Sequence, residues 1–201
     1  GDVTLEGFRP PLLEARVGEE RVQLEVPFTA RHQADNTLAA LAAYRALGLP
    51  LARAAEGARE IAFSRWRGEE HELPGGGLLI NDAYNANPIS MRAALRHHRE
   101  RAGDRRTVAV LGGMAELGEQ TAAYHRAVGE EAAVDVLVAV GELARPYLDA
   151  ETAGERHWVP TREGAVQLLQ DVLEPGDVVL VKGSRSVGLE AVAEALIRVP
   201  A

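Results

Sequence analysis

The chain has 201 residues, 46% of them apolar, and a formal net charge of −8 at pH 7. This length and composition allow a buried core in one domain or in two small ones. The negative charge argues against general nucleic-acid binding, the absence of cysteine excludes disulfides and thiolate metal sites, and no apolar run reaches the roughly 18 residues that span a bilayer. We therefore expect a cytoplasmic protein that binds small molecules, and neither nucleic acid nor a membrane.

The first part of the chain mixes strand-like and helical patterns. Residues 3–7 and 21–26 alternate apolar and polar side chains with the two-residue period of strands. From Asp35 the apolar residues recur with a helical period, and Gly48 and Pro50 are placed to end that helix. These patterns predict two strands followed by a helix.

The pattern changes near residue 82. A short helix over 51–61 precedes a predicted hairpin over 70–80, whose turn is Pro-Gly-Gly-Gly. Asn87 can then cap a new helix, and Pro88 can occupy its first turn because proline lacks only a donor that is unpaired there. From this change we predict a domain boundary that separates residues 1–82 from 83–201.

Beyond this boundary, apolar strands alternate with helices. The predicted strands are 107–112, 135–141, 157–160 and 178–181. The helices between and after them include one near 119–133, one capped by Thr161 and one that ends at Ile197. This alternation predicts an α/β fold with a mostly parallel sheet covered by helices on both faces. Ligands of such folds bind at the carboxyl ends of the strands.

Lys182 is the only lysine of the chain, and the other 21 basic residues are arginines. It follows the predicted strand 178–181 and lies just before Ser184 and Arg185. A rotatable ammonium group with three donors can follow a phosphate or carboxylate through a reaction. We therefore interpret Lys182 and Arg185 as catalytic candidates, and the alternative is a surface lysine beside a tight turn.

The second informative segment is INDAYNANP, at 80–88. Asp82 ends an apolar strand, where one carboxylate can accept both hydroxyl groups of a ribose, although a turn or cap role is the alternative. Tyr84, Asn85 and Asn87 place further polar groups in the same short loop. We expect these three residues to contact a substrate or to form a hinge between the predicted domains.

Three segments together resemble the ATP-dependent Mur ligases of peptidoglycan synthesis. They are INDAYNANPISMRAAL (80–95), VLGGMAELGEQTAAYH (110–125) and LVKGSRSVGLEAV (180–192). The YNANP form resembles the members that add D-alanyl-D-alanine to a UDP-muramoyl tripeptide through an acyl phosphate. The resemblance implies a Rossmann-like C-terminal domain, preceded by the end of an α/β ATP-binding domain.

The resemblance also assigns residues to ligands. In the family, a His-Asn-x-x-Asn stretch contacts adenine through its second asparagine; here Asn36 takes that place, and Gln33 departs from the pattern. Arg67, fifteen residues before Asp82, would hold ATP together with it. Ser184 would contact substrate or belong to the hinge, and Arg185 suits a carboxylate because a guanidinium can donate two parallel hydrogen bonds. Three further residues stay open between site roles and structural ones: Glu116, Glu119 and His125.

The chain lacks a Gly-x-x-x-x-Gly-Lys-[Ser/Thr] phosphate loop. The resemblance implies ATP and Mg²⁺ as cofactors, with the metal ligands upstream of this sequence and no metal site within it. We therefore expect a monomeric fragment that is inactive alone. Two other hypotheses stay open: a related ligase of the folylpolyglutamate type with another acceptor, and a non-catalytic domain that binds a nucleotide or a protein.

Overall fold

The computed structural model describes residues 2–198 and divides the chain into two units, Gly1–Ser64 and Arg65–Ala201. The predicted boundary at 82/83 is therefore too late. The hairpin that we placed before it belongs to the second unit, because its second strand pairs in parallel with a strand near the end of the chain. That pairing lies about a hundred residues away in sequence and leaves no local signal.

The first unit is a three-stranded antiparallel sheet with helices packed against it. Its elements are β1 (Val3–Arg9), β2 (Leu12–Val17), β3 (Glu20–Glu25), α1 (Arg31–Ala46), the 3₁₀ helix η1 (Leu51–Arg53) and α2 (Ala54–Arg59). Alternate residues of β2, namely Leu13, Ala15 and Val17, are buried against Leu41 of α1. The strand β2 was not predicted. The helix α1 begins at Arg31, four residues before the predicted start at Asp35, and the prediction missed this start because no capping side chain marks it.

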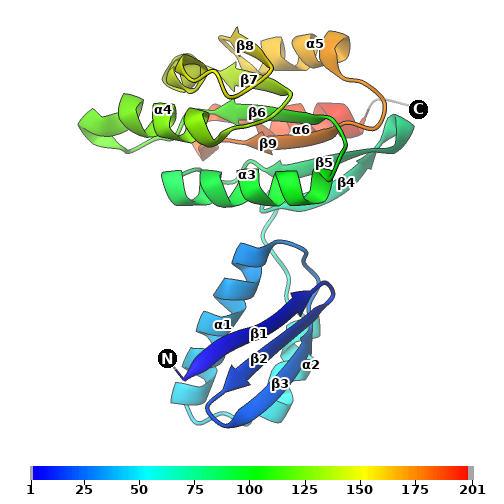
Figure 1. Ribbon diagram of the computed structural model, residues 1–201, viewed down its shortest axis with the longest axis vertical. Coiled ribbons are helices and arrows are strands. Elements are labelled where there is room, and N and C mark those ends of the chain that lie inside the picture. The colour runs from blue at the N-terminus through cyan, green and yellow to red at the C-terminus, as the bar shows by residue number, and fades with distance from the viewer. Residues whose placement is uncertain (1, 199–201) are drawn as a thin grey trace. The chain divides into compact units, whose positions relative to one another are not determined.

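The second unit holds a six-stranded sheet in the order β4-β5-β9-β6-β7-β8 (Figure 1). Its strands are β4 (Glu69–Leu73), β5 (Gly77–Asp82), β6 (Thr107–Gly112), β7 (Val136–Val140), β8 (Glu155–Val159) and β9 (Val178–Lys182). Its helices are α3 (Pro88–Ala102), α4 (Thr121–Glu131), α5 (Arg162–Val172) and α6 (Glu190–Ile197). Short 3₁₀ helices are η2 (Pro74–Gly76), η3 (Gly118–Gln120), η4 (Glu142–Asp149) and η5 (Arg185–Val187). Only β4 runs antiparallel to its neighbour.

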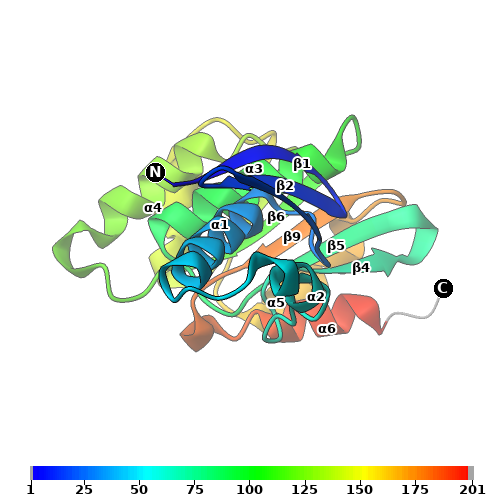
Figure 2. The ribbon, with the colours of Figure 1, turned by 90° about the horizontal axis from the view of Figure 1, so that it is seen from below.

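Each central strand presents alternate residues to opposite cores, as the two-residue period requires. In β6, Ala109 and Leu111 pack with α3, α4 and η4, whereas Val108 and Val110 pack with α5 and α6. Figure 2 shows α3 and α4 on one side of this sheet, and α5 and α6 on the other. The predicted α/β fold with helices on both faces is confirmed. The helix after β7 is η4, a 3₁₀ helix that contains Pro146.

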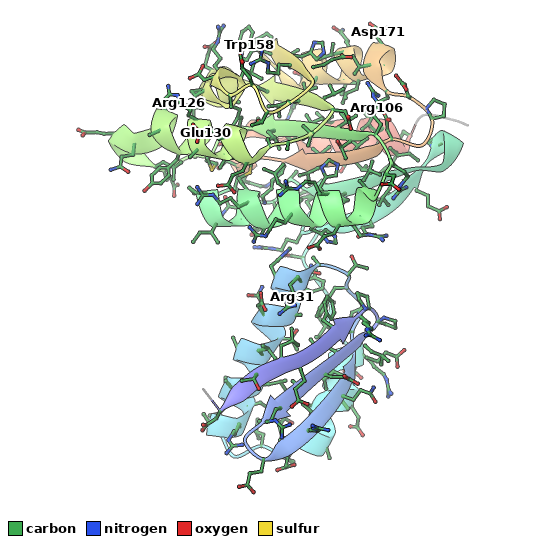
Figure 3. All side chains as sticks on the ribbon, viewed as in Figure 1. Arg31, Arg106, Arg126, Glu130, Trp158 and Asp171 are labelled. Atoms are coloured by element: carbon green, nitrogen blue, oxygen red, sulfur yellow. The ribbon has the colours of Figure 1, made fainter. Side chains whose placement is uncertain are left out.

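At the amino-terminal edge of the sheet, buried polar groups fix strands and helices to one another. Arg106, labelled in Figure 3, precedes β6 and pairs with Asp177, just before β9, at 2.7 Å. His98 of α3 is fully buried, and its Nε2 lies 2.8 Å from the carbonyl oxygen of Val178, to which it must donate. Burial lowers the pKa of His98 from 6.5 to about 4, so the folded protein holds this ring neutral near pH 7.

The contact between α4 and η4 depends on a glycine. A Cβ atom added at Gly129 would collide with the backbone of Tyr147, whose own side chain is fully buried. Gly129→Ala should therefore lower the free energy of unfolding by about 1–3 kcal/mol, the usual cost of overpacking. The matched control is Gly164→Ala in α5, where the nearest atom lies 3.5 Å away and alanine favours the helix. Equal stability of the two variants in urea denaturation would contradict this account.

Candidate functional site

The topology of the second sheet brings three loops to one edge. β9 is inserted between β5 and β6, so Lys182 lies in register with Asp82 on one side and with Leu111 on the other. All three strands are parallel, and their carboxyl ends therefore open on the same side. The loops 83–87, 113–117 and 183–186 follow these three ends. This is the edge at which the sequence predicts ligand binding.

Lys182 joins two of these loops. Its side chain is only 2% exposed, and its Nζ donates to Asp82 Oδ2 at 2.6 Å and to the carbonyl oxygen of Asn85 at 2.9 Å. Both contacts hold the end of β5 and the loop after it. Lys182 is therefore no surface lysine, and its ammonium group is committed to protein acceptors rather than presented to solvent.

The loop after β5 is held along its length. Tyr84 donates its backbone N–H to Trp66 O at 3.0 Å, and Ala86 donates to the side chain of Asn85 at 2.8 Å. Asn87 caps α3 and Pro88 lies in its first turn, as predicted, and Ser90 completes a reciprocal capping box with Asn87. The segment 83–87, in which we expected a hinge between domains, lies inside the second unit, and the boundary between the units precedes Arg65.

Ser184 and His125 fix the loop after β6. Ser184 is buried, and its Oγ accepts the backbone N–H of Ala115 at 3.0 Å. His125 is also buried; its Nε2 accepts from Met114 N at 2.8 Å, so its other nitrogen, Nδ1, carries the proton and donates to Thr121 O at 2.6 Å. Burial lowers the pKa of His125, which favours this neutral form. His125 is thus a structural residue and not the surface histidine that was one alternative.

The three loops enclose a cavity of about 600 Å³. Its lining consists of Tyr84, Asn85, Ala86, Asn87, Ala115, Glu116, Leu117, Ser184, Arg185 and Ser186. Two of these residues are charged, one of each sign: Glu116 and Arg185. Five of the residues predicted from sequence, namely Tyr84, Asn85, Asn87, Ser184 and Arg185, therefore lie around one cavity, whereas Glu119 is not part of it.

Arginine–aromatic contacts surround this edge. The guanidinium of Arg185 lies 4.4 Å from the centre of the Trp66 ring and pairs with Glu190 of α6. The guanidinium of Arg67 lies 3.8 Å from the centre of the Tyr84 ring. Trp66 was missed by sequence reasoning, because nothing in the pattern of residues 61–68 shows that its carbonyl group would bond the loop after β5.

Asn36 belongs to the first unit, where it is exposed on α1. Its assignment to adenine stays a prediction that depends on the resemblance. Across residues 2–198, no group of three or more His, Asp or Glu side chains is arranged so that it could hold a metal ion. Within the same range, none of the helices is both long and apolar enough to cross a membrane.

The family model described as "Mur ligase, glutamate ligase domain" matches residues 66–185, which contain the loops 83–87 and 113–117 and all but the last residue of the loop 183–186. The chain belongs to the Mur ligase family. Two curated relatives are named UDP-N-acetylmuramoyl-tripeptide--D-alanyl-D-alanine ligase: one from Mycobacterium leprae is 36% identical over 98% of this chain, and one from Mycobacterium tuberculosis is 34% identical over 98%. The chain spans 43% and 44% of their lengths.

Solved structures agree with this assignment. A MurF crystal structure from Acinetobacter baumannii has a TM-score of 0.84 and 28% identity, and the match covers 99% of this chain and 45% of that one. A MurF structure from Thermotoga maritima in complex with ADP has a TM-score of 0.81 at 23% identity, and the match covers 98% and 46% of the two chains. The second comparison shows a shared fold.

Proposed function

We propose that this chain forms the acceptor side of an ATP-dependent ligase that adds D-alanyl-D-alanine to a UDP-N-acetylmuramoyl tripeptide. The observation that carries the proposal is the cavity between the three loops, which gathers the segments that resemble this class of Mur ligase. The names of the relatives from Mycobacterium support the choice of acceptor. We place the reaction in the cytoplasm, with a monomeric enzyme and small-molecule partners only.

In this proposal, the intact enzyme activates the tripeptide carboxylate as an acyl phosphate, and the amine of D-alanyl-D-alanine displaces phosphate. Arg185 lines the cavity, and its Nη1 donates to Glu190. Its other guanidinium N–H groups can bind the carboxylate of the dipeptide. Lys182 holds Asp82 and the loop after β5 in place. We therefore propose it as a positioning residue and not as the catalytic residue that the sequence suggested. Mg²⁺ would screen phosphate charge, held by residues outside this chain.

Asp82 and Arg67 form the proposed nucleotide side of the second unit, and Asn36 of the first unit is proposed separately as an adenine contact. Lys182 occupies one carboxylate oxygen of Asp82, and no donor within residues 2–198 bonds the other, Oδ1. That oxygen suits a ribose hydroxyl group. Arg67 lies beside this strand end, since the next residue, Gly68, donates its backbone N–H to Asn81 O at 2.9 Å.

The choice of acceptor can be tested with a chimera in which this chain replaces the matching C-terminal part of the Mycobacterium leprae relative. We expect phosphate release with ATP, Mg²⁺, UDP-muramoyl tripeptide and D-alanyl-D-alanine, and none from the 201-residue chain alone. Consumption of glutamate instead would favour a ligase of the folylpolyglutamate type. Nucleotide binding by a chimera that releases no phosphate with either amine would favour a non-catalytic domain.

Asp82→Asn should weaken ATP binding to the chimera by about 1–3 kcal/mol, the usual range for losing a hydrogen bond to a charged group. The KM for D-alanyl-D-alanine should barely change. A 2′,3′-dideoxy ATP analogue is the control, because it lacks the hydroxyl groups assigned to Asp82. Wild type should bind this analogue more weakly than ATP, whereas the variant should bind the two with similar affinity. If the variant prefers ATP as strongly as wild type does, Asp82 does not hold the ribose.

A further inference from the structure

We propose that Glu116 binds the ammonium group of the incoming acceptor, so that the cavity recognises a small zwitterion by both of its ends. This inference rests on the proposed function and deepens it. Glu116 and Arg185 are the charged residues of the cavity lining, and they come from the loops after β6 and β9. The rest of the lining offers neutral polar side chains and the apolar side chains of two alanines and a leucine. One positive and one negative group match a free dipeptide, which carries an ammonium at one end and a carboxylate at the other.

The backbone at Glu116 supports a ligand role. Its φ is +64°, in the left-handed region that glycine adopts freely and other residues adopt at a cost. In residues 2–198 only Trp66 shares this feature among the non-glycine residues. Glycine would suit the position better on conformational grounds alone, and non-glycine residues held in such conformations cluster at active and ligand-binding sites.

The surroundings also hold Glu116 in place. The preceding residue, Ala115, donates its backbone N–H to buried Ser184, and the residue before that donates to buried His125. These two hydrogen bonds fix the backbone of the loop after β6 just before Glu116. Glu116 itself is exposed, and no salt bridge to another described residue occupies its carboxylate. Because the backbone of the loop is fixed, only the side-chain torsions of Glu116 have to be ordered when its carboxylate binds a cation.

The test is an NMR titration of the full 201-residue chain with D-alanyl-D-alanine, its N-acetyl derivative and its C-terminal amide. Wild type should bind the free dipeptide at least about tenfold more tightly than the N-acetyl form, as loss of a charge-assisted hydrogen bond predicts. Glu116→Gln should remove this preference and leave the affinity for the N-acetyl form unchanged. Glu119→Gln, on the same segment but outside the cavity lining, is the matched control and should behave as wild type.

A second variant separates binding from folding. Glu116→Gly removes the carboxylate and relieves the backbone strain of the positive φ. It should therefore weaken binding of the free dipeptide, as Glu116→Gln does, without lowering the melting temperature of the protein. Equal affinity of wild type for the free and N-acetyl dipeptides, or no binding of either, overturns the proposal. The chimera tests the proposed function separately: turnover of D-alanyl-D-alanine with a KM that Glu116→Gln leaves unchanged would refute the role of Glu116 and keep the function.

Discussion

Lys182→Met is expected to lower the free energy of unfolding of the second unit by about 3 kcal/mol, because removing one partner of a buried ion pair leaves the other charge uncompensated. The lysine side chain is 2% exposed and Asp82 is 19% exposed, so water can relieve only part of this cost. Trp66 and Trp158 both lie in the second unit, and the chain has two tryptophans, so tryptophan fluorescence in urea follows that unit alone.

Two further variants show whether the loss of stability comes from the broken ion pair. The double variant Asp82→Asn with Lys182→Met should be more stable than Lys182→Met, since it removes the buried charge that the single change leaves behind. Arg126→Met is the matched control, because Arg126 and Asp149 form an exposed pair at 2.9 Å, worth about 1 kcal/mol or less. If Lys182→Met loses no more stability than Arg126→Met, the buried pair does not anchor the strand ends.

Acidification should destabilise the second unit through His98. Its pKa is about 4 in the folded protein and 6.5 when exposed, so between these values the unfolded chain binds a proton that the folded one does not. The contribution of His98 to the free energy of unfolding is therefore fully present above pH 6.5 and is lost as the pH falls to 4. The loss amounts to about 3 kcal/mol at 1.36 kcal/mol per pH unit.

His98→Gln isolates this effect. Glutamine can donate to Val178 O as the imidazole does, and it does not titrate. The stability advantage of wild type over the variant should therefore shrink by about 3 kcal/mol between pH 7 and pH 4, measured by urea denaturation at each pH. Because every other titrating group is common to both proteins, its contribution cancels. Parallel pH profiles for the two proteins would show that His98 is not the group responsible.

The fold was predictable where the signal is local. The strand 178–182 and the capped starts of α3 and α5 follow from runs of apolar residues, from Asn87 and from Thr161. β2 also carried a signal, since Leu13, Ala15 and Val17 alternate, but small alanine and the two prolines before the strand weakened it. The start of α1 at Arg31 carried none.

The site was predictable as a set of residues but not as a geometry. The sequence places Asp82 and Lys182 at strand ends, but nothing local states that β9 enters between β5 and β6 and makes the two residues neighbours. For the same reason Lys182 was interpreted as a free cation rather than a buried partner. His125 accepts the backbone N–H of Met114, eleven residues before it, and no sequence pattern marks that N–H as needing an acceptor.

The insertion of β9 also has a consequence for how the protein is made. Synthesis runs from the amino terminus, so β5 and β6, the strands that will flank β9, emerge long before it. Until β9 arrives, both expose unpaired backbone groups along edges that are buried in the finished sheet, and such edges invite pairing with other chains. The nascent second unit is thus most prone to aggregation just before its last strand leaves the ribosome, and a stop codon ahead of residue 178 would leave a sheet without its centre.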